Sequence, residues 1–510
     1  MSNVLGICGY NKSSASSNIL LAAYGNDVVN VSTGFGYGLA LSGNNVDMEP
    51  FLDRIFLQDY SVRPKTFNGT TWSTEYVSRT PIAKFQKNYK EKSRIYLGNC
   101  KFIGPQAPND LNGNPLIFPS RVFYPDLYIG STLTWGIEWG TNGRTTAGSP
   151  YFDLDLPLPQ DFKAVNIKIG DPLFITSGNA QLAAKPYTVA SVESPYRLRM
   201  TENFPVTATS LHYWVGSNWF DVATDDNDQI TGFGENSTRL LVFKLMSLWY
   251  YNGTQKKQIK DAPGTSSARS VINKRGYTYY FHGSDPYSTG IYRHDGVGST
   301  RVSRAIDPFI RGMSAANYDD VIVWEEGENL RWYIGNITNA NYGISMTNAV
   351  ATLNTVTNAW DVSPIDDVIT CSTTFRTSNQ KDTYCGTGDD AVHKMATGNA
   401  FNTAPINMLL ETKVYYPSGT DVINEFPRIQ IIGRQTKGVK VKVKLWNNPR
   451  SVGEWRGIGE LTDDKTELTL PNDYTIASGI QIGYYENGTL ENDIYIEKAT
   501  IFYKPSRVRL

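Results

Sequence analysis

The residues of this chain that are best suited to chemistry are acidic, and they occur in short clusters. Asp225-Asp226-Asn227-Asp228 places three carboxylates in four residues, as a calcium loop does, but it lacks the glycine and the terminal glutamate of an EF-hand. Asp319-Asp320, Asp366-Asp367 and Asp389-Asp390 lie beside expected strands. A glycoside hydrolase needs two carboxylates at a defined separation in one pocket. Aspartate is also a common turn residue, so turn formation is the alternative for each cluster.

Other catalytic signatures are missing from the sequence. It contains no serine nucleophile motif, phosphate-binding loop or dinucleotide fingerprint. Its four histidines, His212, His282, His294 and His393, are few and dispersed, and His294 and His393 occupy similar positions in two repeats, which favours a structural role. The segment Phe67–Trp72 is similar to the Asp-box of sialidases, but it lacks the aspartate and has Gly69 directly after Asn68. The sequence therefore predicts no catalytic residue, no metal ligand and no cofactor.

Two groups of lysines are candidates for binding an anionic partner. Lys440, Lys442 and Lys444 alternate with valines, which places the lysines on one face of a strand. Lys84, Lys87 and Lys90 accumulate before another expected strand. We expect these side chains to face DNA phosphates or an acidic neighbouring subunit. The alternative is a solvated face, or an edge strand that lysines protect against aggregation.

Composition favours a large all-β protein. The 510 residues predict two to four structural units, and the 44 glycines, 25 prolines and 12% aromatic residues are typical of short strands joined by tight turns. Lys and Arg number 48 against 49 Asp and Glu, which argues against a broadly nucleic-acid-binding surface but allows a DNA-facing channel. The cysteines at positions 8, 100, 371 and 385 show no CxxC spacing, so neither a zinc site nor a disulfide framework is expected, and assembly in a reducing cytoplasm fits. No stretch is apolar enough for membrane insertion.

One repeating unit organises most of the chain. A β-rich run is followed by a polar interval and then by an aromatic residue or histidine close to Asn-Gly or Asp-Gly, as at Asn68-Gly69, Asn252-Gly253 and Asp295-Gly296. These dipeptides favour the positive φ angles of two-residue hairpin turns. Meanders of about 40–50 residues predict the blades of a β-propeller, six or seven in number, with unrelated hairpins as the alternative.

Two regions depart from this repeat and define the expected domains. Residues 150–222, with the runs Val165–Asp171 and Tyr187–Val192, predict a small β-barrel inserted into a blade loop. Residues 404–510 predict a C-terminal, jelly-roll-like β-sandwich. The propeller itself is expected to comprise residues 1–149 and 223–403.

Three blocks carry a resemblance to a known family: Phe51–Ser73, Asp225–Trp249 and Gly264–Ile306. They resemble propeller tail-hub proteins of tailed bacteriophages, including the packaged-DNA stabilisation or nozzle proteins of short-tailed phages. The resemblance implies a virion structural protein without enzymatic activity, assembled in the host cytoplasm as a homo-oligomeric ring, commonly hexameric. It implies contacts with the adaptor, the portal-proximal ring and tail fibres, and a lumen that retains and conducts genomic DNA during ejection.

Two other functions are compatible with the sequence. A carbohydrate-active propeller, either a glycosidase or a lectin-like receptor-binding protein, would bind sugars through exposed aromatics such as Trp446, Trp455, Tyr484 and Tyr485, although these residues also suit a core. A monomeric host-attachment module at a tail tip is the third reading.

Overall fold

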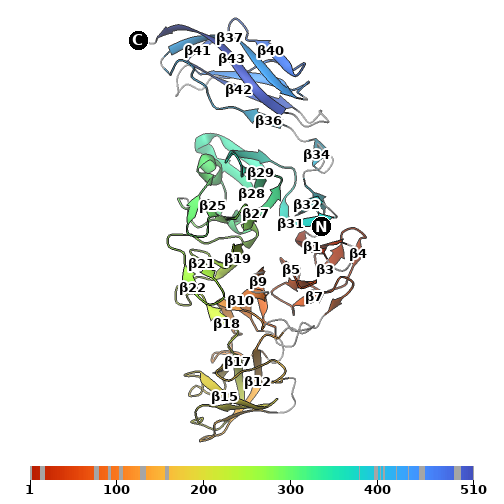
Figure 1. The fold of residues 1–510 in the computed structure, drawn as a ribbon, viewed down its shortest axis with the longest axis vertical. Helices are drawn as coiled ribbons and strands as arrows, with labels where there is room; N and C mark the ends of the chain where they lie inside the picture. Colours follow the sequence, from red (N-terminus) through yellow and green to blue (C-terminus); the bar gives the residue numbers. More distant parts are fainter. Residues whose placement is uncertain are drawn as a thin grey trace. The chain divides into compact units, whose positions relative to one another are not determined.

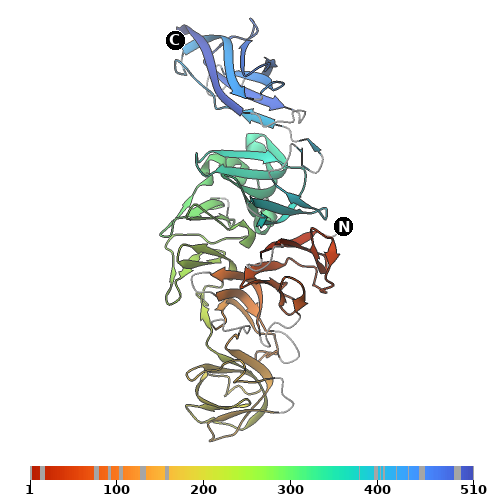
Figure 2. The same cartoon turned by 45° about the vertical axis from the view of Figure 1, so that its right-hand side comes forward.

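The structure is a computed structural model of an almost entirely β protein (Figures 1 and 2). The chain divides into two compact units, Met1–Ala396 and Thr397–Leu510. Within the described residues the one α-helix is α1 (Asp307–Ile310), accompanied by the short 3-10 helices η2 (Ala268–Ser270), η3 (Ser303–Ile306), η4 (Ala315–Asp320) and η5 (Ala340–Tyr342). No helix in this part of the chain is long and apolar enough to cross a membrane. The expected all-β class is confirmed.

The description covers most of the chain. It comprises residues 3–11, 18–73, 80–89, 94–102, 107–126, 134–155, 160–285, 287–377, 380–395, 400–401, 404–405, 408–420, 422–434, 436–446, 454–486 and 495–508. Of the predicted basic residues, Lys90 lies outside these ranges.

The described part of the first unit contains seven small antiparallel sheets in addition to a barrel. The first sheet contains β1 (Val4–Asn11), β2 (Asn18–Tyr24), β3 (Asp27–Asn30) and β4 (Phe35–Gly36). The second contains β5 (Asp47–Phe51), β6 (Arg54–Gln58), β7 (Lys65–Phe67) and β8 (Trp72–Ser73). The third contains β9 (Ile82–Tyr89), β10 (Arg94–Lys101), β11 (Ile117–Phe123) and β18 (Trp219–Asp221).

The remaining four sheets repeat the same meander. The fourth contains β19 (Ile230–Asn236), β20 (Arg239–Lys244), β21 (Leu248–Tyr251) and β22 (Lys256–Gln258). The fifth contains β23 (Ile272–Lys274), β24 (Tyr277–His282), β25 (Gly290–His294) and β26 (Ser299–Arg301). The sixth contains β27 (Ile322–Glu326), β28 (Asn329–Asn339), β29 (Ile344–Asn354) and β30 (Trp360–Pro364), and the seventh contains β31 (Ile369–Thr377), β32 (Gln380–Thr387) and β33 (Val392–Lys394).

The sheets follow one another in a circle. β1 contacts β5 on one side and β31 on the other, β5 contacts β9, and β9 contacts β19. β19 contacts β23, and β27 contacts both η2 and β31, so the order closes on itself. Each sheet is packed between two others, which explains why Leu240, Val242 and Phe243 of β20 are all buried although they point to both faces.

The Asn-Gly and Asp-Gly dipeptides form turns of one common type. Each follows the third strand of a sheet, and Gly69, Gly253 and Gly296 have the expected positive φ. The two-residue length is wrong, because the strands on either side are separated by four residues. The side-chain oxygen of the Asn or Asp accepts from the two amides that lie two and three residues ahead, as Asn252 Oδ1 does from Thr254 N (3.0 Å) and Gln255 N (2.7 Å). This side-chain bond replaces the tight hairpin as the feature that shapes the loop.

A closed six-stranded barrel lies between β11 and β18 in the chain. Its strands are β12 (Ile137–Thr145), β13 (Tyr151–Leu154), β14 (Pro172–Ser177), β15 (Tyr187–Ser194), β16 (Arg197–Met200) and β17 (Ala208–Gly216). The barrel strands thus begin before residue 150. The run at 165–171 forms turns and no strand. Val165 and Ile167 are buried in the barrel core, which explains the alternation of apolar and polar residues there.

The second unit contains two larger sheets that share one apolar core. The first contains β36 (Met408–Glu411), β42 (Gly479–Glu486), β38 (Lys440–Trp446) and β39 (Trp455–Glu460). The second contains β37 (Val422–Arg434), β40 (Lys465–Thr469), β41 (Ile476–Ala477) and β43 (Tyr495–Val508). A short pair, β34 (Ala400–Phe401) and β35 (Ala404–Pro405), precedes them in the chain. The division after Ala396 lies seven residues before the expected domain start at 404.

Candidate functional site

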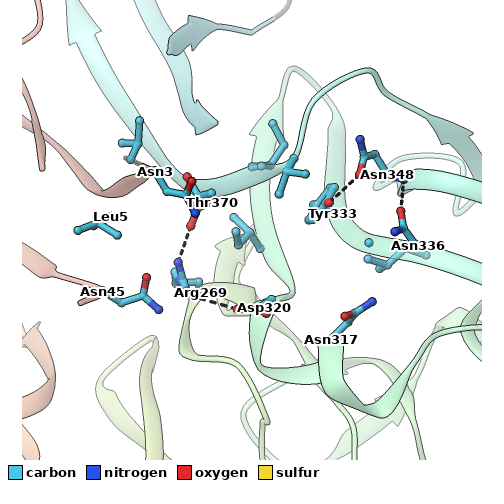
Figure 3. Close-up of a pocket in the computed structure, with 16 residues that line it drawn as sticks. Asn3, Leu5, Asn45, Arg269, Asn317, Asp320, Tyr333, Asn336, Asn348 and Thr370 are labelled. Atoms are coloured by element: carbon cyan, nitrogen blue, oxygen red, sulfur yellow. Dashed lines mark hydrogen bonds and ion pairs between the residues drawn. The ribbon is translucent and has the colours of Figure 1, made fainter. Parts of the chain in front are cut away.

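A cavity of about 280 Å³, lined by both polar and apolar residues, lies where the first strands of several sheets of the first unit begin (Figure 3). Its walls come from the segments leading into β1, β5, β23, β27 and β31, and from β28 and β29. The polar residues that line it are Asn3, Asn45, Arg269, Asn317, Asp320, Tyr333, Asn336, Asn348 and Thr370. The beginnings of the first strands of several sheets are therefore brought together although they are far apart in the sequence.

Arg269 connects two sides of this cavity (Figure 3). Its guanidinium donates to the carbonyl oxygen of Thr370, and it lies 3.8 Å from Asp320 Oδ1. The Asp320 side chain is 68% exposed, so this ion pair is screened by solvent and contributes little to stability. Arg269 thus links η2, which precedes β23, to the start of β31, and this is a structural role.

A bulged strand supplies the opposite wall. The register of β28 against β29 shifts on both sides of Gly335, whose φ is 71°. Tyr333 donates its hydroxyl to Asn348 Oδ1 (3.0 Å), and Asn348 N donates to Asn336 Oδ1 (2.9 Å). Burial raises the pKa of Tyr333 to about 12, so its hydroxyl stays protonated and is a poor nucleophile.

The chemistry available in this cavity is limited. Asp320 is the one carboxylate among the lining residues, so the cavity lacks the pair of carboxylates that a glycosidase needs. The hydroxyl of Tyr333 and the oxygen of Asn336 are both hydrogen-bonded to Asn348. This arrangement can accept a neutral, hydrogen-bonding group, but it offers no acid–base pair.

The aspartate loop at 225–228 holds a lysine in place of a metal ion. The fully buried Lys244 donates to the carbonyl oxygens of Val222 (2.9 Å) and Ala223 (2.7 Å) and to the carboxylate of Asp226. Asp228 accepts from the amides of the loop that follows β20. A side-chain cation therefore already occupies the loop, which favours the turn interpretation over calcium.

The predicted lysines are distributed over several environments. Lys84 is exposed on β9, whereas Lys87 on the same strand lies 3.3 Å from Glu49, and the charge of Glu49 raises the pKa of Lys87. Lys440, Lys442 and Lys444 do share one face of β38, opposite the buried Val441 and Val443. β38 lies between β42 and β39, so it is not the edge strand that one alternative required.

Aromatic rings accompany the lysines of β38. Lys442 Nζ lies 4.3 Å from the Trp455 ring centre and 2.8 Å from Glu411, and Lys440 lies over Tyr485. Trp446 is half-buried beside Lys444, whereas Tyr484 is buried in the core and cannot bind a sugar in this fold.

The four cysteines are buried and unbridged, and burial raises their thiol pKa values, which makes them unreactive.

One cluster was missed by the sequence reasoning. Asp367, Asp389 and His393 each place a potential metal-ligand atom within 4.8 Å of the others. Asp389 and His393 are four residues apart across the β32–β33 turn, and this spacing was the one available signal. The position of Asp367 depends on the pairing of β31 with β32, which spacing along the chain does not reveal.

Comparison with known proteins gives only remote similarities. No protein-family model matches the chain, and no curated protein matches it. Matching solved structures include the phage phi92 endosialidase (11% identity, 75% of this chain, 50% of that chain, TM-score 0.22) and a puromycin hydrolase mutant (10%, 75%, 50%, 0.29), so the chain spans about half the length of these two. A mutant of Trypanosoma rangeli sialidase also matches (8%, 90%, 95%, 0.25). Identities and TM-scores this low carry no argument about activity.

Proposed function

We propose that this chain is a non-enzymatic structural protein of a tailed-phage virion, and that its seven described sheets are the blades of a β-propeller. The observation that carries the proposal is the circular order of the sheets, in which β1 packs beside β31. Radial repetition of this kind leaves only short edges and makes a rigid body. A rigid body suits an assembly of identical subunits with closed symmetry.

The hydrogen bonds of the side chains that line the cavity support a role without catalysis. Arg269 is engaged with Thr370, and Tyr333 is engaged with Asn348. A general base must be deprotonated to accept a proton, whereas burial holds the hydroxyl of Tyr333 in its protonated form. We therefore interpret the cavity as part of the framework that holds the sheets together.

The appended parts extend the surface available for assembly. We propose that the two sheets of the second unit form a β-sandwich, because Ile429 and Ile431 of one sheet and Val441 and Val443 of the other belong to a single core. In the proposed ring, this sandwich and the inserted barrel contact neighbouring subunits, the adaptor or tail fibres, and the lumen conducts DNA.

The symmetry and mass of the purified full-length chain test this proposal. We expect mass photometry and negative-stain images to show a closed ring of several subunits, and antibody labelling to place the protein on the virion tail. A monomer that is absent from virions would contradict the proposal.

Two exposed residues allow the contact surface to be located. Tyr287 is 84% exposed and Val297 is 86% exposed, in the loops at opposite ends of the fifth sheet. A new charge in a buried apolar contact costs several-fold in association. Tyr287→Asp or Val297→Asp should abolish ring formation if its end of the sheet is an interface, and each variant serves as the matched control for the other.

Carbohydrate binding by the second unit is a second candidate function, favoured by the face that bears Lys442 and Trp455. Gly457 and Gly483 flank Lys442 on the adjacent strands, so two positions beside it carry no side chain. Aromatic rings next to lysines on this face of the sheet suit an acidic glycan. The rings stack on sugar faces, and the ammonium groups bind carboxylates.

A glycan array with the full chain tests the second candidate. Trp455→Ala should weaken binding of an acidic glycan by about tenfold, equal to about 1.4 kcal/mol. Tyr503→Ala removes an exposed aromatic from the other sheet and should leave binding unchanged. Absence of glycan binding by the unaltered protein would exclude this function for the face.

A further inference from the structure

Three potential metal ligands converge at one end of the seventh sheet. Asp367 precedes β31, Asp389 lies in the turn between β32 and β33, and His393 lies on β33. The antiparallel pairing of Ile369 with Thr387 continues toward Asp367 and Asp389, so the two carboxylates face each other across the sheet end. One ligand atom from each of the three side chains lies within 4.8 Å of the others.

The surroundings of Asp367 favour a cation. Its Oδ2 atom is buried, has no hydrogen-bond partner among the described residues, and lies 3.9 Å from Nε2 of His393. Asp389 adds a second carboxylate beside it, so a cation bound between the two would offset the repulsion between their negative charges. His393 offers the third ligand atom, since an imidazole nitrogen is a common metal ligand.

We propose that Asp367, Asp389 and His393 bind one divalent transition-metal ion of the Zn²⁺ or Mn²⁺ class. Ligand atoms lie about 2.1 Å from zinc, so two ligands of one ion are at most about 4.2 Å apart. The Asp367–His393 separation of 3.9 Å already meets this limit, and because all the ligand atoms lie within 4.8 Å of one another, the other separations need at most a shift of a fraction of an ångström. One imidazole beside two carboxylates selects such ions over Ca²⁺ and Mg²⁺, which prefer oxygen ligands alone.

The site joins segments that the fold must hold together. An ion bound there would link the segment entering β31 to the β32–β33 turn, within the described sheet that packs beside β1. Binding to the folded state stabilises it in proportion to ion concentration. The expected role is therefore a cross-link where the circle of sheets closes.

Metal titration of the full chain, prepared without a polyhistidine tag and freed of metal with a chelator, tests the proposal. We expect calorimetry with Zn²⁺ to give one saturable site per chain, weakened at least about tenfold in Asp367→Asn and in His393→Gln. Asp366→Asn removes the adjacent exposed carboxylate and should bind Zn²⁺ as the unaltered chain does.

A spectroscopic readout separates a lost ligand from a lost fold. Co²⁺ added to the unaltered chain should give a visible absorption band that is displaced by Zn²⁺ and absent in His393→Gln, while the circular dichroism of that variant is unchanged. Equal Zn²⁺ binding by the unaltered chain and both ligand variants would overturn the proposal. Binding of Ca²⁺ as tight as that of Zn²⁺ and insensitive to His393→Gln would also overturn it.

Discussion

The loop at residues 225–228 and the cluster at Asp367, Asp389 and His393 both gather carboxylates, but they are neutralised differently. In the loop, the buried ammonium of Lys244 bonds to Asp226 and to the carbonyl oxygens of Val222 and Ala223. In the cluster, Asp367 faces both the carboxylate of Asp389 and, at 3.9 Å, the imidazole of His393. The first region therefore contains a lysine ammonium as its own cation, whereas the second places an imidazole beside its carboxylates.

This difference shows that a run of aspartates is a poor guide to metal binding. The loop has the higher local density of acidic residues, yet its central position is filled by a side chain 18 residues further along the chain. The cluster has fewer carboxylates, contributed by separate segments. Whether a carboxylate site accepts an ion depends on what the rest of the fold supplies there.

The largest expected effect comes from removing the internal cation. Lys244→Met leaves two buried carbonyl oxygens without their donor and Asp226 without its partner, as in breaking a buried ion pair. Because the Asp226 side chain is 35% exposed, solvent offsets part of the loss, and we expect a destabilisation of about 2–4 kcal/mol. Urea unfolding of the full chain measures it.

The control for this variant is Lys256→Met. Lys256 also donates to a backbone carbonyl, that of Asp221, but its side chain is exposed. Surface substitutions of this kind change stability by less than about 0.5 kcal/mol. Equal effects of the two variants would show that Lys244 is not a special neutralising group.

A smaller effect is expected if Lys244→Met converts the loop at residues 225–228 into a site that binds an external cation. In Lys244→Met, the oxygens of Asp226, Val222 and Ala223 remain grouped, and oxygen ligands of this kind suit Ca²⁺. If the dissociation constant is about 1 mM, 10 mM Ca²⁺ should restore about 1.4 kcal/mol of stability. The unaltered chain should gain less, since the lysine occupies the position, and an equal gain in both proteins would contradict the comparison.

Much of the architecture follows from local sequence. The alternation of lysines with Val441 and Val443 correctly placed the lysines on one strand face, because side chains of a strand alternate between its faces. Asn252-Gly253 correctly marked a turn with positive φ. Its length was wrong because the side-chain oxygen of Asn252 bonds to two amides, which stabilises a longer loop than the dipeptide alone suggests.

The candidate sites depended on long-range contacts that local patterns do not contain. Arg269 reaches Thr370 across about 100 residues of chain, and Lys244 reaches back to Val222. Likewise, β18 follows the barrel in the chain but completes the third sheet, because it pairs with β11. Sequence reasoning identified none of these partners, because each contact joins segments that are far apart in the chain.

The smallest expected effect is a pH dependence confined to the second region. Because burial and Asp389 raise the pKa of Asp367 above its unfolded value, the folded chain binds this proton more tightly than the unfolded chain does. The stability of the metal-free protein should therefore fall as pH rises from about 4 through the raised value. Asp367→Asn removes that part of the slope.

Other buried acids titrate in the same range, so the informative quantity is the difference between the unaltered chain and Asp367→Asn. Burial raises the pKa of Asp47 to about 7, and that contribution is common to both proteins and cancels. Thermal unfolding between pH 4 and 7 in the presence of a chelator should show the flatter profile in the variant. Adding Zn²⁺ should reverse the sign for the unaltered chain alone, since ion binding requires the deprotonated carboxylate. Parallel profiles with and without Zn²⁺ would mean that the second region, like the first, needs no external cation.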